Sequence, residues 1–141
     1  MISKELISII NEIKKKDKMS FVNGIADDEI LAFEKEKSIV LPSKYKEWLE
    51  FSDGGELYLP AGVQLYGVAH QPLINEDNDS RPSEDYVVIG ALATGDPILF
   101  KKNSELIAIY NQQVGRIEDD EVYEDFFAFL KDLHDLLGIG E

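Results

Sequence analysis

The spacing of apolar residues changes at Gly54-Gly55, and this change constrains the fold more than any other feature of the sequence. Before the two glycines, apolar residues recur every three or four positions, as on one face of a helix. After them, short apolar or alternating segments are separated by turn residues, as in strands. One more helical stripe ends the chain. This order predicts an α+β domain with a mostly antiparallel sheet, because parallel strands would alternate with helices.

Four segments have the residue spacing of helices. We expect them over residues 2–16, 27–37, 42–51 and 122–137, with a loop over 17–26. Asp27 or Asp28 is expected to cap the second helix. Pro42 suits the first turn of the third helix, where its missing N–H removes no hydrogen bond. Gly54-Gly55 is expected to end that helix in the left-handed conformation that glycine allows.

Most of the chain between residues 56 and 117 has the pattern of strands. We expect a hairpin from residues 56–59 and 63–66. The nearly continuous apolar run from Tyr86 to Leu92 is typical of a central strand that is covered on both faces. Further strands are expected over residues 98–100, 106–110 and 114–117. The polar stretch from His70 to Asp85 is expected to be an exposed loop.

The composition excludes several classes of protein. The 141 residues fit one domain over residues 1–141. Without cysteine there are no disulfides, and a reducing compartment is favoured. Two histidines are too few for a zinc site without cysteine.

No apolar run approaches the roughly 18 residues of a membrane helix, and Glu5 stands where a secretory signal carries positive charge. We therefore expect a cytoplasmic protein with no cofactor, metal site or membrane contact.

Motif spacing gives little support for catalysis. Gly90 and Gly95 have the spacing of a phosphate-binding loop, but Asp96 stands where that loop requires lysine. Asp77-Asn78-Asp79 begins like a calcium loop, but Pro82 and Val88 stand where Gly and Glu are needed. We therefore expect no enzyme. An acid-dependent hydrolase, which would need two converging carboxylates, is the enzyme alternative.

Charge is distributed unevenly along the chain. The formal net charge is −14, from 14 basic and 28 acidic side chains. Residues 1–50 hold 9 basic and 10 acidic side chains, whereas residues 51–141 hold 5 and 18. A protein this acidic is repelled by nucleic-acid phosphates and anionic membranes, but it attracts a cationic partner protein. The alternative is that the acidity only keeps the protein soluble.

Three motifs, in order along the chain, carry a family resemblance. They are Leu41-Pro42-Ser43-Lys44-Tyr45-Lys46-Glu47-Trp48-Leu49 with Asp53-Gly54-Gly55, then Gly95-Asp96-Pro97-Ile98-Leu99-Phe100, then Phe126-Phe127-Ala128-Phe129-Leu130. From about Asp27 to the C-terminus they resemble the SUKH superfamily, the Smi–Knr-like domain, which usually has Asn where Asp53 stands. The resemblance implies a single twisted, mostly antiparallel sheet with N-terminal helices and one C-terminal helix packed against it.

The resemblance also implies a class of function. Bacterial members are mainly immunity proteins that bind and neutralise secreted polymorphic toxins, many of them nucleases, whereas eukaryotic relatives are regulatory interaction modules. We therefore expect an immunity (antitoxin) protein that occludes a cognate toxin stoichiometrically, as a monomer or weak homodimer. The expected toxin is a basic nuclease. A regulatory protein–protein interaction module with a non-toxin partner is the alternative.

Acidic side chains gather at two places in the second part of the chain. A nuclease needs positive charge to hold a phosphate backbone, so an acidic inhibitor complements the same surface. We expect the partner-binding surface to comprise a loop cluster of Glu76, Asp77, Asp79, Glu84 and Asp85, and a second cluster of Glu118, Asp119, Asp120 and Glu121. The alternative for the loop cluster is an ordinary solvated loop. The alternative for the second cluster is capping of the last helix.

Overall fold

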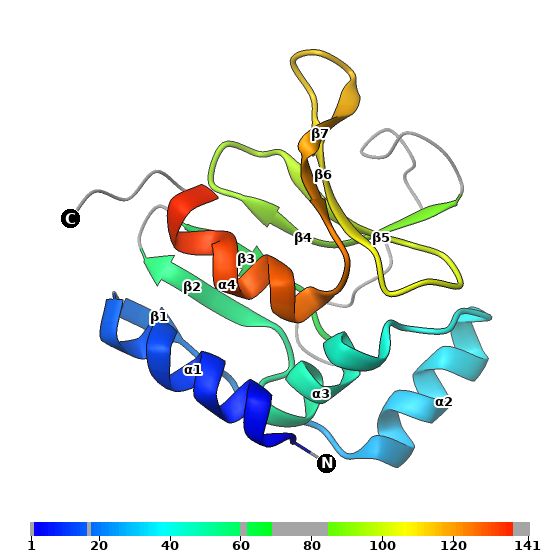
Figure 1. Cartoon of the computed structure of the whole chain (residues 1–141). Helices are drawn as coiled ribbons and strands as arrows, with labels where there is room; N and C mark the ends of the chain where they lie inside the picture. Colours follow the sequence, from blue (N-terminus) through cyan, green and yellow to red (C-terminus); the bar gives the residue numbers. More distant parts are fainter. Residues whose placement is uncertain (1, 17, 60–61, 69–84, 137–141) are drawn as a thin grey trace.

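The computed structural model describes residues 2–16, 18–59, 62–68 and 85–136 of the chain (Figure 1). Its strands form one antiparallel sheet in which each strand pairs with the next along the chain. The strands are β1 (Lys18–Ser20), β2 (Gly55–Leu59), β3 (Val63–Leu65), β4 (Tyr86–Leu92), β5 (Pro97–Lys101), β6 (Ile107–Asn111) and β7 (Arg116–Tyr123). The helices are α1 (Lys4–Lys16), α2 (Asp27–Lys37), α3 (Ser43–Phe51) and α4 (Phe126–Leu136). The predicted α+β class is confirmed.

The main core lies between the sheet and the helices in front of it (Figure 1). Helix α4 contacts α1, α3 and β7. The rings of Tyr45 and Trp48 on α3 meet Phe126 of α4 edge to face, with centroids 4.8 and 5.9 Å apart. Along β4 and β5, Val88 and Leu99 lie outside this core cluster, yet they are buried as well. Both faces of the central strands are therefore covered, as their continuous apolar sequence predicts.

Two predicted boundaries in the chain are wrong. Residues 17–26 were expected to form a loop, but Lys18–Ser20 form the short strand β1, in which Lys18 pairs with Leu59 and Ser20 with Glu56. The last helix was expected to begin at Val122, but it begins at Phe126. The residues before it are held in β7 by pairing with β6. In both places, pairing with a neighbouring strand outweighs the local preference of the sequence.

The ends of α2 and α3 also differ from expectation. The N-cap of α2 is Ala26, one residue before the predicted aspartates, and it makes no side-chain capping bond. Pro42 is the N-cap of α3 and not a residue of its first turn. At its other end α3 stops at Phe51, with an extended residue next in the chain. Gly54-Gly55, at φ +93° and +112°, turns the chain into β2 and does not directly end the helix.

Candidate functional site

The predicted loop cluster falls almost entirely outside the described residues. Glu76, Asp77, Asp79 and Glu84 lie there, and only Asp85 is described. Asp85 is exposed and directly precedes β4, and its backbone carbonyl accepts a hydrogen bond from the N–H of Lys102 at 2.7 Å. The assignment of the loop cluster to partner binding therefore remains a prediction.

The second cluster lies in β7, which is the edge strand of the described sheet. On either side of the cluster β7 pairs with β6, Ile117 opposite Tyr110 and Val122 opposite Ala108. Between these pairs β7 advances by five residues while β6 advances by two, so β7 carries a bulge of three extra residues. Four residues of β7 therefore lie opposite the single β6 residue Ile109. They are Glu118, Asp119, Asp120 and Glu121, and we call these four residues the acidic edge.

A bulge bends its strand and takes the extra residues out of the regular hydrogen-bonded ladder. Asp119 is exposed and Glu118 and Glu121 are half-buried, while the side chain of Asp120 lies outside the described residues. An exposed ion pair joins Glu118 Oε2 to Arg116 Nη2 at 3.5 Å. Bulges and charges on an edge strand oppose pairing with another strand. This edge is therefore poorly suited to join two copies of the chain.

The capping role considered for the acidic edge belongs to a different residue. Asp125 Oδ1 accepts the N–H of Ala128 at 2.8 Å, and the backbone carbonyl of Asp125 accepts the N–H of Phe129. Asp125 Oδ2 also lies 2.9 Å from Lys44 Nζ. The helix-capping interpretation of Glu118, Asp119, Asp120 and Glu121 is wrong, because α4 begins after them and is capped by Asp125. An Asp directly before an apolar run is a cap signal that the sequence does contain.

The contacts of Asp125 change the proton affinity of both partners. Burial by itself raises the pKa of Asp125, but the Ala128 N–H and the Lys44 ammonium outweigh burial, so this pKa lies below its ordinary value. The hydrogen bond to Asp125 raises the pKa of Lys44 above its ordinary value. Both side chains are therefore charged at neutral pH, and together they fix the start of α4 against α3.

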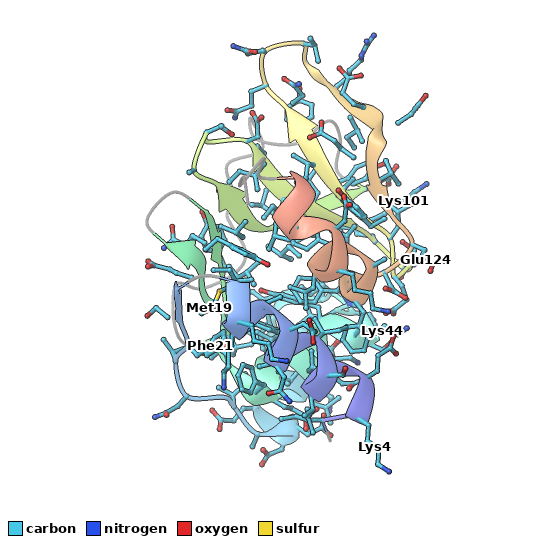
Figure 2. The ribbon with its side chains drawn as sticks, turned by 60° about the vertical axis from the view of Figure 1, so that its left-hand side comes forward. Lys4, Met19, Phe21, Lys44, Lys101 and Glu124 are labelled. Carbon is cyan, nitrogen blue, oxygen red and sulfur yellow. The ribbon has the colours of Figure 1, made fainter. Side chains whose placement is uncertain are left out.

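An acidic cleft of about 400 Å³ continues from the end of β7 along α4 and α1. It is lined by Glu5, Lys44, Glu124, Asp125, Ala128, Lys131 and Asp132. Figure 2 shows Lys44 and Glu124 on one side of the molecule, away from Met19 and Phe21 near β1. Ion pairs join Glu5 to Lys131 at 3.1 Å and Asp125 to Lys44. With four carboxylates and two ammonium groups the cleft keeps a net negative charge, so the acidity of β7 extends around the start of α4.

The structure does not bring Asp85 and the acidic edge together. Asp85 precedes β4, and three inter-strand spacings of about 4.8 Å separate β4 from β7. The acidic edge also lies opposite Ile109 in the middle of β6, whereas Asp85 lies beyond the end of β4, beside Lys102. Within the described residues, Asp85 is thus separate from the acidic edge.

Within the described ranges, no group of three or more His, Cys, Asp or Glu side chains is arranged to hold a metal ion. No helix in those ranges is long and apolar enough to cross a membrane.

Comparison with protein families identifies the fold. Residues 24–132 match the SMI1 / KNR4 family (SUKH-1), which is more than half of the chain. The chain belongs to this family. No curated protein matches it. As a SUKH-1 member the protein is an immunity-type or Smi/Knr-like module that acts through contact with another protein, in a family that is generally non-catalytic.

The first family motif of this SUKH-1 chain builds the core and not a surface. The indole N–H of Trp48 donates to the carbonyl of Gly54 at 2.9 Å, and the Oγ of Ser52 donates to the same carbonyl at 2.9 Å. Asp53 is buried, and its Oδ1 accepts the N–H of Val68 at 2.6 Å. A Cβ on Gly67 would lie 2.1 Å from that Oδ1. These contacts join the end of α3 to β2 and to the segment after β3.

The N-terminus of α3 is held by Glu105, a residue for which the sequence predicts no role. Glu105, from the loop before β6, accepts the N–H of Ser43 at 2.8 Å, its hydroxyl at 2.9 Å and the N–H of Lys44 at 3.2 Å. This SUKH-1 chain therefore caps α3 with a carboxylate from about 60 residues away, in place of a local N-cap side chain. No local pattern signals such a contact.

Proposed function

We propose that the protein is a cytoplasmic immunity protein that binds a cognate secreted toxin stoichiometrically and occludes its active surface. The proposed toxin is a basic nuclease. One observation carries this proposal: a bulge on the edge strand β7 presents four consecutive acidic residues. Membership of the SUKH-1 family supports the immunity class.

The acidic edge complements a nuclease because its carboxylates carry the same negative charge as the phosphates that a nuclease binds. A nuclease surface carries Lys and Arg side chains to hold a nucleic-acid backbone. Carboxylates on a projecting edge offer the same surface a substitute for phosphates. The net charge of −14 also accelerates the encounter with a basic protein. The acidic cleft beside α4 extends the negative surface beyond β7.

The experiment that tests this function recovers the partner. The tagged protein is incubated with lysate and culture supernatant of its own cells at about 0.15 M salt and again at about 1 M salt, where the Debye length falls from about 8 Å to about 3 Å. The proposal predicts recovery of a basic secreted polypeptide with nuclease activity, in smaller yield at high salt. Recovery of only cytoplasmic regulators would contradict the toxin and favour the regulatory module.

Two matched variants locate the binding surface. The acidic-edge variant combines Glu118→Gln, Asp119→Asn, Asp120→Asn and Glu121→Gln. The control variant combines Glu12→Gln, Asp28→Asn, Glu29→Gln and Glu36→Gln, whose side chains are exposed on α1 and α2. Each removes four negative charges, so a general effect of net charge is equal in both. The proposal predicts reduced recovery with the acidic-edge variant alone, and equal recovery with both would place the surface elsewhere.

A further inference from the structure

A second surface of the protein has the opposite character to the acidic edge. A groove of about 370 Å³ lies between the C-terminal end of α2 and the turn that joins β5 to β6. It is lined by Leu31, Glu34, Lys35, Ser38, Ile39, Val40, Lys102 and Asn103. This volume is near the lower end of the range for small-ligand pockets, so it suits a few side chains of a peptide segment.

Aliphatic side chains at the groove are unusually exposed. Leu31 is 51% exposed and Val40 is 61% exposed, and Ile39 also lines the groove. Single exposed aliphatic residues are ordinary on protein surfaces, whereas Leu31 and Val40 line the same groove. Burial of these side chains against a partner would remove apolar area from water and stabilise the complex.

The rim of the groove is basic on a protein with twice as many acidic as basic residues. Lys35 and Lys102 line it, and within the part of the chain that the structure describes neither is within 4 Å of a carboxylate. By contrast, Lys44, Lys46 and Lys131 all have carboxylate partners. The two groove lysines are therefore available to a ligand's carboxylates.

The carboxylate that lines the groove does not cancel this positive charge. Glu34 Oε2 accepts the N–H of Leu41 at 2.7 Å and lies 3.6 Å from Lys46 Nζ. The side chain is largely buried, and its charge is matched by Lys46. Glu34 thus fixes the floor of the groove, and the net charge presented to a ligand comes from Lys35 and Lys102.

Both walls of the groove are fixed by backbone hydrogen bonds. At the end of α2, Ser38 has φ +55°, and the N–H of Ile39 donates to the carbonyl of Glu34 at 3.0 Å. On the other wall Asn103 has φ +62°, and the N–H of Lys102 donates to Asp85 at 2.7 Å. A ligand therefore meets a preformed site, which reduces the entropy cost of binding.

We infer that this groove docks an acidic segment of another protein that carries at least one aliphatic side chain. The aliphatic side chain packs on Leu31, Ile39 and Val40, and carboxylates beside it pair with Lys35 and Lys102. The inference goes beyond the proposed function, since the acidic edge selects a basic surface and this groove an acidic one. Nucleic acid is disfavoured because the floor is aliphatic and only two lysines line the groove, which can pair with few phosphates.

The negative charge of the whole molecule does not prevent this contact. At physiological salt the Debye length is about 8 Å, so charges farther away than this are largely screened. The nearest charges decide the local attraction, and since Glu34 is paired with Lys46, the unpaired charges that line the groove are those of Lys35 and Lys102. The long-range repulsion instead slows association, so the complex is expected to gain its affinity from a low dissociation rate.

The test uses a random peptide library displayed on phage and selected on the intact protein. Selections on the wild-type protein and on the double variant Leu31→Ser, Lys102→Glu are run in parallel. The inference predicts peptides enriched only on the wild-type protein, with Asp or Glu beside Leu, Ile or Val. Failure to enrich any peptide over the double variant would overturn it, as would enrichment of peptides without acidic residues.

Binding constants of an enriched synthetic peptide then locate its site. Leu31→Ser and Lys102→Glu are each expected to raise its Kd by about fivefold or more. Leu31→Ser removes about half of the buried apolar area of one aliphatic side chain, and Lys102→Glu removes one ion pair. Ile7→Ser and Lys4→Glu, at exposed positions on α1, are the matched controls and are expected to leave Kd unchanged. Equal effects of test and control variants would overturn the inference.

Two other occupants are distinguished in the same experiments. Binding of a duplex DNA oligonucleotide that Lys102→Glu abolishes would assign the groove to nucleic acid and contradict the inference. A concentration-dependent dimer, seen by sedimentation and lost in Leu31→Ser, would assign it to a second copy of the chain and contradict the inference as well. The unchanged fluorescence of buried Trp48 verifies that each variant is folded.

Discussion

The buried carboxylate of Asp53 offers the sharpest test of how the family motif stabilises the fold. Asp53 is 2% exposed and accepts the N–H of Val68 at 2.6 Å. Asp53→Ala removes the acceptor of this hydrogen bond and leaves a partly buried N–H without it. Such a loss costs about 3 kcal/mol. This is a large share of the roughly 5–15 kcal/mol that stabilises a typical domain.

Urea unfolding followed by tryptophan fluorescence measures this cost directly. Trp48 is the only tryptophan, is fully buried and donates its indole N–H to Gly54, so its emission reports on the same part of the structure. With a slope of about 2 kcal/mol per M urea, Asp53→Ala is expected to lower the midpoint by about 1.5 M. Asp53→Asn keeps an acceptor oxygen and is expected to cost about 1 kcal/mol or less.

The control for this series is Glu36→Ala, at an exposed position of α2, which is expected to change the free energy of unfolding by less than about 0.5 kcal/mol. Equal midpoints for Asp53→Ala and Asp53→Asn would contradict this stabilising role of Asp53, since the hydrogen bond to Val68 would then contribute nothing. A shift for Asp53→Ala no larger than that of Glu36→Ala would refute it as well.

Three further predictions concern the helix ends. Glu105→Ala is expected to lower the free energy of unfolding by about 1–2 kcal/mol, because α3 loses its carboxylate cap; a cost below that of Glu36→Ala in urea would contradict this cap. Asp125→Ala is expected to cost about 1 kcal/mol at pH 7. Because the pKa of Asp125 is lowered in the folded state, its carboxylate stabilises the fold fully above the unfolded carboxyl pKa of about 3.9, and this stabilisation is lost as the pH falls through the lower folded value. A difference in the free energy of unfolding between wild-type and Asp125→Ala proteins that persists at lower pH would contradict this cap. Ser38→Gly, at φ +55°, is expected to stabilise the protein by about 0.5–1 kcal/mol in thermal unfolding, and a lower Tm would show that the left-handed backbone at this position is unstrained.

Elements with a strong local pattern were predictable from the sequence. The apolar spacing of α1 and α2 and the continuous apolar runs of β4 and β5 all fold as their periodicity predicts. In these segments the local preference and the tertiary environment agree. A buried strand needs only apolar side chains, and an amphipathic helix needs only one apolar face.

The misplaced elements are those in which pairing outweighs local preference. The Asp and Glu residues of the acidic edge are disfavoured in strands and favoured at helix starts, so the local signal predicted a helix that begins directly after them, at Val122. Pairing of Ile107 with Tyr123 and of Ala108 with Val122 keeps this segment in β7. Likewise β1 has only three residues, and its conformation follows from pairing with β2.

The two candidate surfaces differ in how far sequence alone reveals them. The acidic edge is contiguous, so its charge was evident, but its bulge on an edge strand was not. The groove is assembled from residues around Leu31 and around Lys102, about 70 positions apart. No spacing rule joins two such segments, and only the packing of α2 beside the β5–β6 turn does so.

The proposed function requires that the acidic edge binds and inhibits a basic toxin. The most direct measurement is a titration of the nuclease activity of the recovered toxin with this protein and with the two four-site variants. Complete inhibition at a 1:1 ratio is expected for the wild-type and control proteins, and association of the toxin with the acidic-edge variant is expected to be slower by about tenfold or more at low salt. Undiminished nuclease activity in excess protein, or equal association rates for both variants, would contradict it.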